Sequence, residues 1–108
     1  MAHRINDTNP YRSPQSTDAI PTHRVILHND PINDIVFVVR VIHDVFGYGY
    51  LRSTWLTLKV HFCRRGTLWV GDEREAQRLA TQLTGLGPDP SQVKNGAQPL
   101  STSVETYP

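Results

Sequence analysis

Short hydrophobic runs between turn-forming residues predict three strands. Residues 23–28, His-Arg-Val-Ile-Leu-His, form a β-branched run that is typical of a buried strand. Residues 67–70, Thr-Leu-Trp-Val, predict a second strand after a break at Arg-Arg-Gly, residues 64–66. A last short strand is expected over residues 100–105. The other hydrophobic stretches have the spacing of helices.

The stretch from Ile35 to Phe46 is ambiguous, because its many valines favour a strand by intrinsic preference. Its length and its flanking residues favour a helix. Asn33 is the candidate N-cap, and Gly47 stands where the helix is expected to end. The hydrophobic residues then share one helical face, which comprises Ile35, Val38, Val39, Ile42, Val45 and Phe46.

Two further helices are expected. In the second, over residues 51–63, one face repeats at helical spacing and other hydrophobic residues lie alongside it. That face comprises Leu51, Trp55, Leu58 and Phe62, with Leu56, Val60 and Cys63 beside it. The third helix opens at a capping box formed by Asp72 and Glu75 and ends at Gly85. Its inward face comprises Ala76, Leu79, Ala80 and Leu83.

Residues 85–99 are rich in glycine and proline and are expected to form a loop. The order strand, helix, helix, strand, helix, strand therefore predicts an α+β domain with a three-stranded sheet packed against helices. A chain of 108 residues has room for one such domain. Residues 1–21 are mostly polar and contain several prolines, which predicts a flexible tail and leaves residues 22–108 as the folded domain.

Charge and cysteine content exclude several classes of function. The formal net charge is +1, so no long-range field attracts nucleic acid or an anionic membrane. A single cysteine excludes an internal disulfide, and no hydrophobic run approaches the roughly 20 residues that span a bilayer. The first residues lack the hydrophobic stretch of a signal peptide, so a cytosolic protein is expected. The histidines show no paired metal-ligand spacing, and no metal or cofactor is expected.

Three polar residues are candidates for binding one ligand together. Asn29 and Asp30 directly follow the first strand, and His61 lies within the second helix. Each alone has an ordinary explanation, as a turn residue or as a histidine at the edge of a core. Together they offer an amide oxygen, a carboxylate and a ring nitrogen, which suit the three donors and the positive charge of a primary ammonium.

Hydrophobic residues near these three could line a pocket for one side chain. They are Ile35, Val38, Val60 and Leu100. An ammonium beside a hydrophobic side chain is what the first residue of a protein presents. The residues therefore suggest a binding site for a free protein N-terminus.

Two motifs resemble those of the ClpS family of adaptor proteins. The stretch from Arg24 to Asn33, followed by Phe-Val-Val-Arg-Val-Ile over residues 37–42, is similar to the family's signature. Leu-Lys-Val-His over residues 58–61 is similar to its second motif, at a matching spacing from Asn29. The likeness covers roughly residues 23–105, and the conjunction of the two motifs is its specific part.

The resemblance implies a non-enzymatic adaptor that binds the free N-terminal residue of a substrate and delivers the substrate to an ATP-dependent Clp protease. It implies that Asn29 and His61 bind the α-amino group directly, and that Asp30 does so directly or through water. Asn33 would lie near the backbone of the second substrate residue, and Ile35 at the gate of the side-chain pocket. The pocket walls implied are Leu27, Val38, Thr57, Val60 and Leu100. The expected partner is the N-terminal domain of a ClpA- or ClpC-type unfoldase, which could also engage the tail, and the adaptor is expected to be a monomer.

Some residues depart from the family's pattern. Pro31 replaces a second acidic residue of many members, and Ile35 and Thr57 stand where methionine is frequent. A β-branched gate is stiffer than methionine and Thr57 is smaller, so we expect a deeper and less adaptable pocket. It should accept Phe, Tyr, Trp or Leu and favour the aromatic residues. Arg74 and Leu79 stand where acidic and basic residues would help to dock the unfoldase.

Two other classes of function remain open at this point. A structural interaction module of the same fold would present a helix to a protein partner and would have no pocket for an N-terminus. An enzyme with Cys63 as nucleophile and His61 as base is disfavoured. Side chains two residues apart on a helix point about 200° from each other and do not easily meet.

Overall fold

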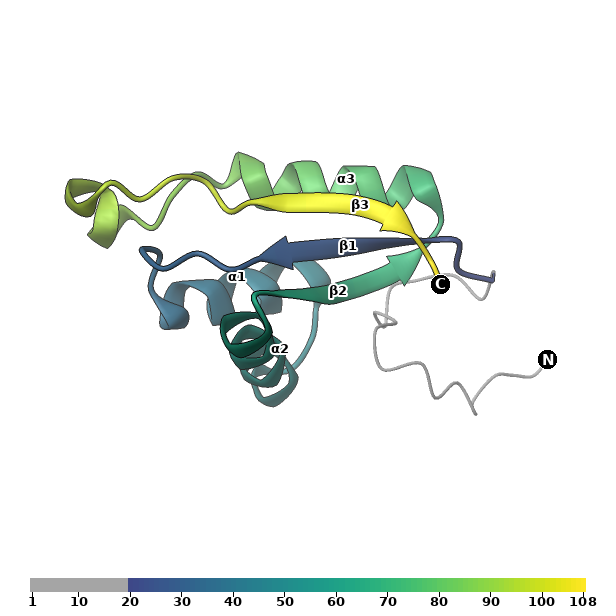
Figure 1. Cartoon of the computed structure of the whole chain (residues 1–108), viewed down its shortest axis with the longest axis horizontal. Coiled ribbons are helices and arrows are strands. Elements are labelled where there is room, and N and C mark those ends of the chain that lie inside the picture. The colour runs from purple at the N-terminus through teal and green to yellow at the C-terminus, as the bar shows by residue number, and fades with distance from the viewer. Residues whose placement is uncertain (1–19) are drawn as a thin grey trace.

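The computed structural model describes residues 20–108, and the expected α+β order is confirmed. The elements are β1 (His23–His28), α1 (Ile35–Phe46), α2 (Tyr50–Cys63), β2 (Arg65–Gly71), α3 (Glu73–Gly85), the 3-10 helix η1 (Pro90–Asn95) and β3 (Thr102–Thr106). In Figure 1, α3 runs along β3, and α1 and α2 lie below the sheet. No helix within residues 20–108 combines the length and the apolar character needed to cross a membrane.

The three strands form one sheet in the order β2-β1-β3, and both pairings are antiparallel. Val25 at the centre of β1 lies opposite Trp69 of β2 and Val104 of β3. Because both neighbours run against β1, the end of β1 lies beside the starts of β2 and β3. The residues that follow β1 therefore emerge next to the end of α2 and next to residues 100–101. This arrangement places the site.

The hydrophobic core lies between the sheet and the helices. Alternate residues of the central strand, Val25 and Leu27, point into it and are fully buried. The predicted inner face of α3 is confirmed, because Ala76, Leu79, Ala80 and Leu83 are all buried. The capping box is confirmed in half: Asp72 Oδ1 accepts a hydrogen bond from the N–H of Glu75 at 2.7 Å, while the Glu75 side chain pairs with Arg78.

Helix α1 differs from its prediction at its start. Asp34, not Asn33, is the N-cap residue, and it makes no side-chain capping bond. Asn33 is buried instead, because its side chain bonds to a distant loop. Val41 is buried, whereas Val39, which was expected on the inner face, is only partly buried. The predicted end is confirmed, since Gly47 caps the helix with a φ of 74°.

The predicted inner face of α2 is wrong. Its buried residues are Ser53, Leu56, Thr57 and Val60, while Leu51, Trp55, Leu58, Phe62 and Cys63 are exposed. The helix is turned so that two small polar residues, Ser53 and Thr57, face inward. Thr57 satisfies its hydroxyl within the helix by donating to the carbonyl of Ser53 at 2.8 Å. A search for hydrophobic periodicity selects the larger side chains and therefore picks the wrong face.

The segments around β2 and β3 also differ from expectation. β2 starts earlier than predicted, at Arg65, and β3 covers Thr102–Thr106. The region 85–99 is not a simple loop, because it contains η1. Its first turn is capped by Asp89, whose side chain accepts from the N–H of Ser91 at 2.9 Å. The predicted tail, residues 1–21, lies almost entirely outside the described residues.

Candidate functional site

A backbone hydrogen bond brings the end of β1 to the end of α2. The N–H of Asn29 donates to the carbonyl oxygen of Arg64 at 2.7 Å. Arg64 ends α2 with a φ of 77°, a left-handed conformation that turns the chain sharply into β2. His61 lies one helical turn earlier, so this bond holds Asn29 close to the last turn of α2.

A second backbone hydrogen bond joins the end of β1 to the residues that precede β3. The N–H of His28 donates to the carbonyl oxygen of Ser101 at 2.9 Å, which holds the residues before β3 against the end of β1. Leu100, the residue before Ser101, is buried there. Three segments distant in sequence therefore meet around the end of β1.

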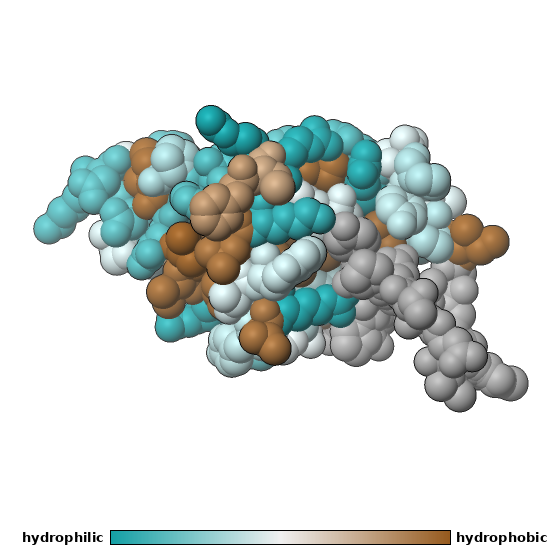
Figure 2. All heavy atoms as spheres, turned by 60° about the horizontal axis from the view of Figure 1, so that its bottom comes forward, coloured by the Kyte–Doolittle hydropathy of each residue, from teal (hydrophilic) through white to brown (hydrophobic). Residues whose placement is uncertain are grey.

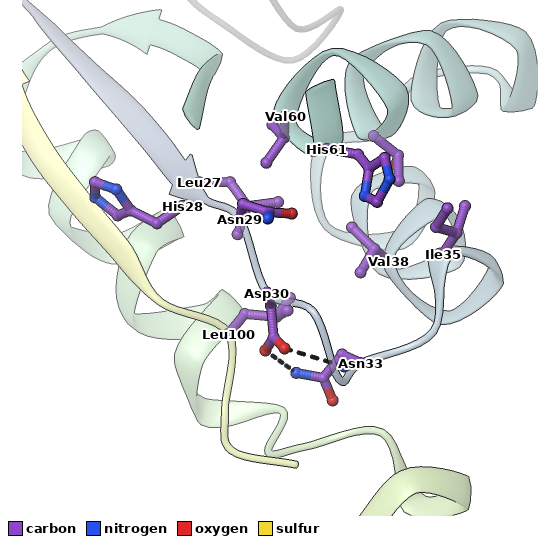
Figure 3. Close-up of a pocket in the computed structure, with 11 residues that line it drawn as sticks. Leu27, His28, Asn29, Asp30, Asn33, Ile35, Val38, Val60, His61 and Leu100 are labelled. Carbon is purple, nitrogen blue, oxygen red and sulfur yellow. Dashed lines mark hydrogen bonds between the residues drawn. The ribbon is translucent and has the colours of Figure 1, made fainter. Parts of the chain in front are cut away.

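A pocket lies where these segments meet (Figure 3). It encloses about 310 Å³, counting the space at its open mouth. Its lining residues are Leu27, His28, Asn29, Asp30, Asn33, Ile35, Val38, Thr57, Val60, His61 and Leu100. All ten residues that the sequence singled out line this one pocket, and His28 is the eleventh. The buried lining is mainly hydrophobic, with Thr57 as a small polar member.

Asn29 and His61 border the pocket from two sides. Figure 3 shows the amide of Asn29 directed toward α2, where the ring of His61 projects over the same space. The His61 ring also makes an edge contact with Phe62, with the ring centroids 5.1 Å apart. An amide oxygen and an imidazole nitrogen thus stand beside an apolar cavity, which is the arrangement expected for an ammonium attached to a hydrophobic side chain.

Asp30 is placed differently from Asn29. Its Oδ1 accepts hydrogen bonds from the N–H groups of Ile32 at 2.8 Å and Asn33 at 3.1 Å. Its Oδ2 accepts from the side-chain amide of Asn33. Figure 3 shows the carboxylate turned toward Asn33 and away from His61. Asp30 therefore shapes the turn after β1 and places a negative charge near the pocket.

The side chain of Asn33 is a clamp between two loops. Its amide also donates to the carbonyl of Gln98 at 2.9 Å, and its Oδ1 accepts from the N–H of Asp89 at 2.8 Å. The side chain of Asp89 in turn accepts from the N–H of Asp34 at 3.2 Å. These bonds attach the glycine- and proline-rich segment to the turn that precedes α1, and they leave Asn33 with only 5% of its surface exposed.

The pKa of Asp89 reflects this setting. Burial raises the pKa of this carboxyl, but hydrogen bonds from the Ser91 side chain and from the N–H groups of Ser91 and Asp34 favour the charged form. The hydrogen bonds prevail, and the pKa of Asp89 lies below its ordinary value. The clamp therefore contains an ionised carboxylate at neutral pH.

His28 is the lining residue that sequence reasoning missed. Its ring is turned toward β3, away from His61, and its Nε2 lies 2.9 Å from the hydroxyl oxygen of Ser103 (Figure 3). The only signal available in the sequence was its position directly before Asn29. Nothing in its residue type separates it from a strand histidine facing solvent.

Cys63, the nucleophile of the disfavoured enzyme reading, lies away from the pocket. Cys63 is exposed at the end of α2 and does not line the pocket. Across residues 20–108, no three His, Cys, Asp or Glu side chains gather in a way that could hold a metal ion.

Similarity to characterised proteins extends over most of the described chain. A ClpS solved structure, that of Agrobacterium tumefaciens ClpS2 bound to L-phenylalaninamide, has a TM-score of 0.69 and 23% sequence identity, covering 81% of this chain and 98% of that one. At this identity the likeness shows a shared fold. It agrees with the strand and helix order described above.

Two sequence relatives are named ATP-dependent Clp protease adapter protein ClpS. The protein from Streptomyces coelicolor is 34% identical over 62 residues, which cover 57% of this chain and 65% of the relative. The protein from Streptomyces avermitilis is 36% identical over 62 residues, which cover 57% of this chain and 59% of the relative. The matched region thus spans less than two thirds of each relative's length.

A family profile covers more of the chain than either relative does. The profile described as ATP-dependent Clp protease adaptor protein ClpS matches residues 18–102, which include every residue that lines the pocket. The match agrees with the fold and with the two motifs around Asn29 and His61. The chain belongs to the ClpS family.

Proposed function

We propose that this chain captures the N-terminal residue of a polypeptide and delivers that polypeptide to an ATP-dependent Clp protease. The observation that carries the proposal is the placement of Asn29 and His61 on two sides of one hydrophobic pocket. A free α-amino group carries three donors and a positive charge, and it is always attached to a side chain. A pocket with polar acceptors at its edge and hydrophobic walls suits both parts.

All the lining residues except His28 have a role in this proposal. Asn29 and His61 accept hydrogen bonds from the α-amino group, and Asp30 adds favourable charge, directly or through water. Ile35 forms the gate. The first side chain of the ligand lies against Leu27, Val38, Thr57, Val60 and Leu100. We expect Phe, Tyr, Trp and Leu to be bound, because the walls are apolar and Thr57 leaves more depth than a larger residue would.

Asn33 acts indirectly. Its side chain is engaged by Asp30, Asp89 and Gln98, so we assign it to positioning the pocket rather than to binding the second residue of the ligand.

The existence of a related structure whose name records bound L-phenylalaninamide supports an aromatic first residue as the ligand.

Delivery completes the proposed function. The family name describes an adaptor and not a protease, so the chain itself is proposed to carry no catalytic step. We propose a monomeric cytosolic adaptor whose partner is the N-terminal domain of a ClpA- or ClpC-type unfoldase. The partner would take over the polypeptide whose first residue lies in the pocket.

Calorimetry with matched peptides tests the binding step. A peptide that starts with Phe should bind, and its N-acetylated form should bind at least about tenfold more weakly, because acetylation removes the charge and two donors. Asn29→Ala and His61→Ala should each reduce affinity for the free peptide about tenfold or more. Asn95→Ala and His23→Ala, which change residues outside the pocket, are the matched controls and should leave affinity unchanged. Equal affinity for the free and acetylated peptides would refute the proposal.

A further inference from the structure

The most exposed lining residues of the pocket indicate where its mouth lies. Among its eleven lining residues, the two that are exposed are Ile35, at the start of α1, and His61, in the last turn of α2. The mouth therefore lies between these two helices. A polypeptide whose first residue is bound must leave through this gap.

An exposed hydrophobic surface begins at the mouth. It consists of four side chains at helical spacing along α2, and we call it the α2 ridge: Leu51 (87% exposed), Trp55 (56%), Leu58 (38%) and Phe62 (76%). Figure 2 shows hydrophobic side chains gathered on the face to which α1 and α2 contribute. Hydrophobic side chains scattered singly need no explanation, whereas exposed ones that gather on one face favour an interaction surface.

The ridge is continuous with the pocket. Leu58 precedes His61 by three residues, so the two side chains lie about 60° apart around the helix. Phe62 follows His61 directly and contacts its ring edge-on. On the other side of the mouth, Val36 stands beside Ile35 and has 62% of its surface exposed. A chain that leaves the pocket thus meets apolar surface on both sides.

The length of the ridge fits a short stretch of extended chain. Leu51 and Phe62 are eleven residues apart, which corresponds to about 16 Å along a helix. An extended polypeptide covers about 3.3 Å per residue, so about five of its residues would span the ridge.

We propose that the α2 ridge binds hydrophobic side chains that follow the first residue of the captured polypeptide, within about its second to sixth positions. This inference rests on the proposed function and narrows its substrate class. Hydrophobic side chains near a chain terminus are usually buried in a folded protein. The ligands selected are therefore polypeptides with an unfolded or newly cleaved N-terminal segment.

Three ligands that share the same first residue separate the pocket from the ridge. They are L-phenylalaninamide, which can fill only the pocket, the peptide Phe-Ser-Gly-Ser-Gly-Ser, and the peptide Phe-Leu-Ser-Leu-Val-Ser. We expect the native protein to bind the hydrophobic peptide about five- to tenfold more tightly than the polar one in calorimetry. Phe62→Ser should reduce that preference to less than about twofold, and Leu51→Ser, three turns from the mouth, should reduce it in part.

Two controls make the test specific. Leu51→Ser should leave the affinity for L-phenylalaninamide unchanged. Phe62→Ser removes an edge contact to the His61 ring, so any loss of affinity for L-phenylalaninamide should equal its loss for the polar peptide, and the ratio of the two peptide affinities still measures the ridge. Val93→Ser replaces an exposed hydrophobic residue of η1 that lies outside the ridge, at 53% exposure, and should preserve the preference for the hydrophobic peptide.

Three results would overturn the inference. The first is equal affinity of the native protein for the two peptides, and the second is a preference that survives in Phe62→Ser. The third is a concentration-dependent dimer in light scattering that Phe62→Ser abolishes, because the ridge would then belong to an interface between two copies. Failure of L-phenylalaninamide and of both peptides to bind would instead remove the proposed function itself, and the inference with it.

Discussion

Gly66 of β2 lies directly against Val60 of α2, so that a Cβ atom added at Gly66 would come within 2.9 Å of the Val60 Cγ2. The contact exists because Arg64 turns the chain back on the helix, which places the first residues of β2 beside the last turns of α2. Val60 is also a wall of the pocket. The absence of a side chain at Gly66 is therefore a condition for the shape of the pocket.

Gly66→Ala should destabilise the protein and constrict the pocket. The methyl group must displace Val60, whose β-branched side chain has little freedom to move, so we expect a loss of about 1 to 3 kcal/mol in the free energy of unfolding. Urea unfolding measures this loss, and calorimetry with L-phenylalaninamide measures the change in the pocket. Gly85→Ala is the control, because a Cβ there meets nothing within 4 Å. If Gly66→Ala and the native protein had the same free energy of unfolding, Val60 would be able to shift without loss of stability, and the prediction would be wrong.

The hydroxyl of Tyr48 is a second point of support for the core. Tyr48 is buried in the turn between α1 and α2, and its hydroxyl donates to the carbonyl oxygen of Leu68 in β2 at 2.7 Å. Burial raises the pKa of Tyr48 well above its ordinary value, so the phenol remains a donor. Tyr48→Phe should cost about 1 to 2 kcal/mol, because it removes the donor and keeps the ring stacked on Phe46.

The exposed Tyr50 offers a matched control for this hydroxyl. Tyr50 is the first residue of α2, and its ring stacks on His43 of α1, yet more than half of its surface is exposed. Tyr50→Phe should change the free energy of unfolding by less than about 0.5 kcal/mol. If the two substitutions had equal effects in thermal unfolding, the hydrogen bond from Tyr48 to Leu68 would not contribute to the stability of the protein.

The sequence predicted the element order because that order rested on local signals, and the resemblance to the ClpS family supplied the residues that line one pocket in the structure. Turn residues bounded the strands, and the Asp72 cap and Gly47 marked helix ends. The two motifs around Asn29 and His61 identified the residues of the pocket. The antiparallel sheet then brings those two motifs together. Residue 29 follows the central strand, and residue 61 precedes the strand beside it.

The sequence failed where the relevant partner is distant. The face of α2 was assigned by the size of its hydrophobic residues, and nothing local indicates that Thr57 faces inward while Trp55 does not. Asn33 was read as a helix cap, although its partners Asp89 and Gln98 come from a segment far along the chain. The orientation of the Asp30 carboxylate has a local cause instead, since it accepts hydrogen bonds from the N–H groups of Ile32 and Asn33 in the same turn.

The ionised carboxylate of Asp89 should make the clamp sensitive to acid. The folded-state pKa of Asp89 is below its ordinary value, so its contribution to stability is fully present above about pH 4 and is lost as the pH falls through the lower folded-state pKa. Asp89→Asn should therefore flatten part of the acid side of the stability profile in urea unfolding between about pH 5 and pH 2.5. Asp44→Asn, at an exposed position on α1, is the control. An acid profile that is identical in native protein and Asp89→Asn would contradict the assignment.

Asn33→Ala should release the glycine- and proline-rich segment from the pocket. The substitution leaves the carbonyl of Gln98 and the N–H of Asp89 without their partner, at a cost of about 1 to 3 kcal/mol for each buried group that stays unsatisfied. We expect a measurable loss in the free energy of unfolding and faster hydrogen exchange at the Asp89 amide. Affinity for L-phenylalaninamide should fall as well, because Leu100 follows Gln98 closely and forms a wall of the pocket.

The matched control for this clamp is Asn95→Ala. Asn95 is an exposed asparagine of the same segment, and its amide donates to the side chain of Gln92 at 2.8 Å. Its removal should change stability by less than about 0.5 kcal/mol and leave exchange at Asp89 as it is in the native protein. Slow exchange at Asp89 in Asn33→Ala would mean that the segment is held by η1 and its own cap. In that case Asn33 would have no role in positioning Leu100, and the pocket wall would depend on other bonds, such as the backbone bond between His28 and Ser101 and the bond from Thr84 Oγ1 to the Leu100 carbonyl at 3.3 Å.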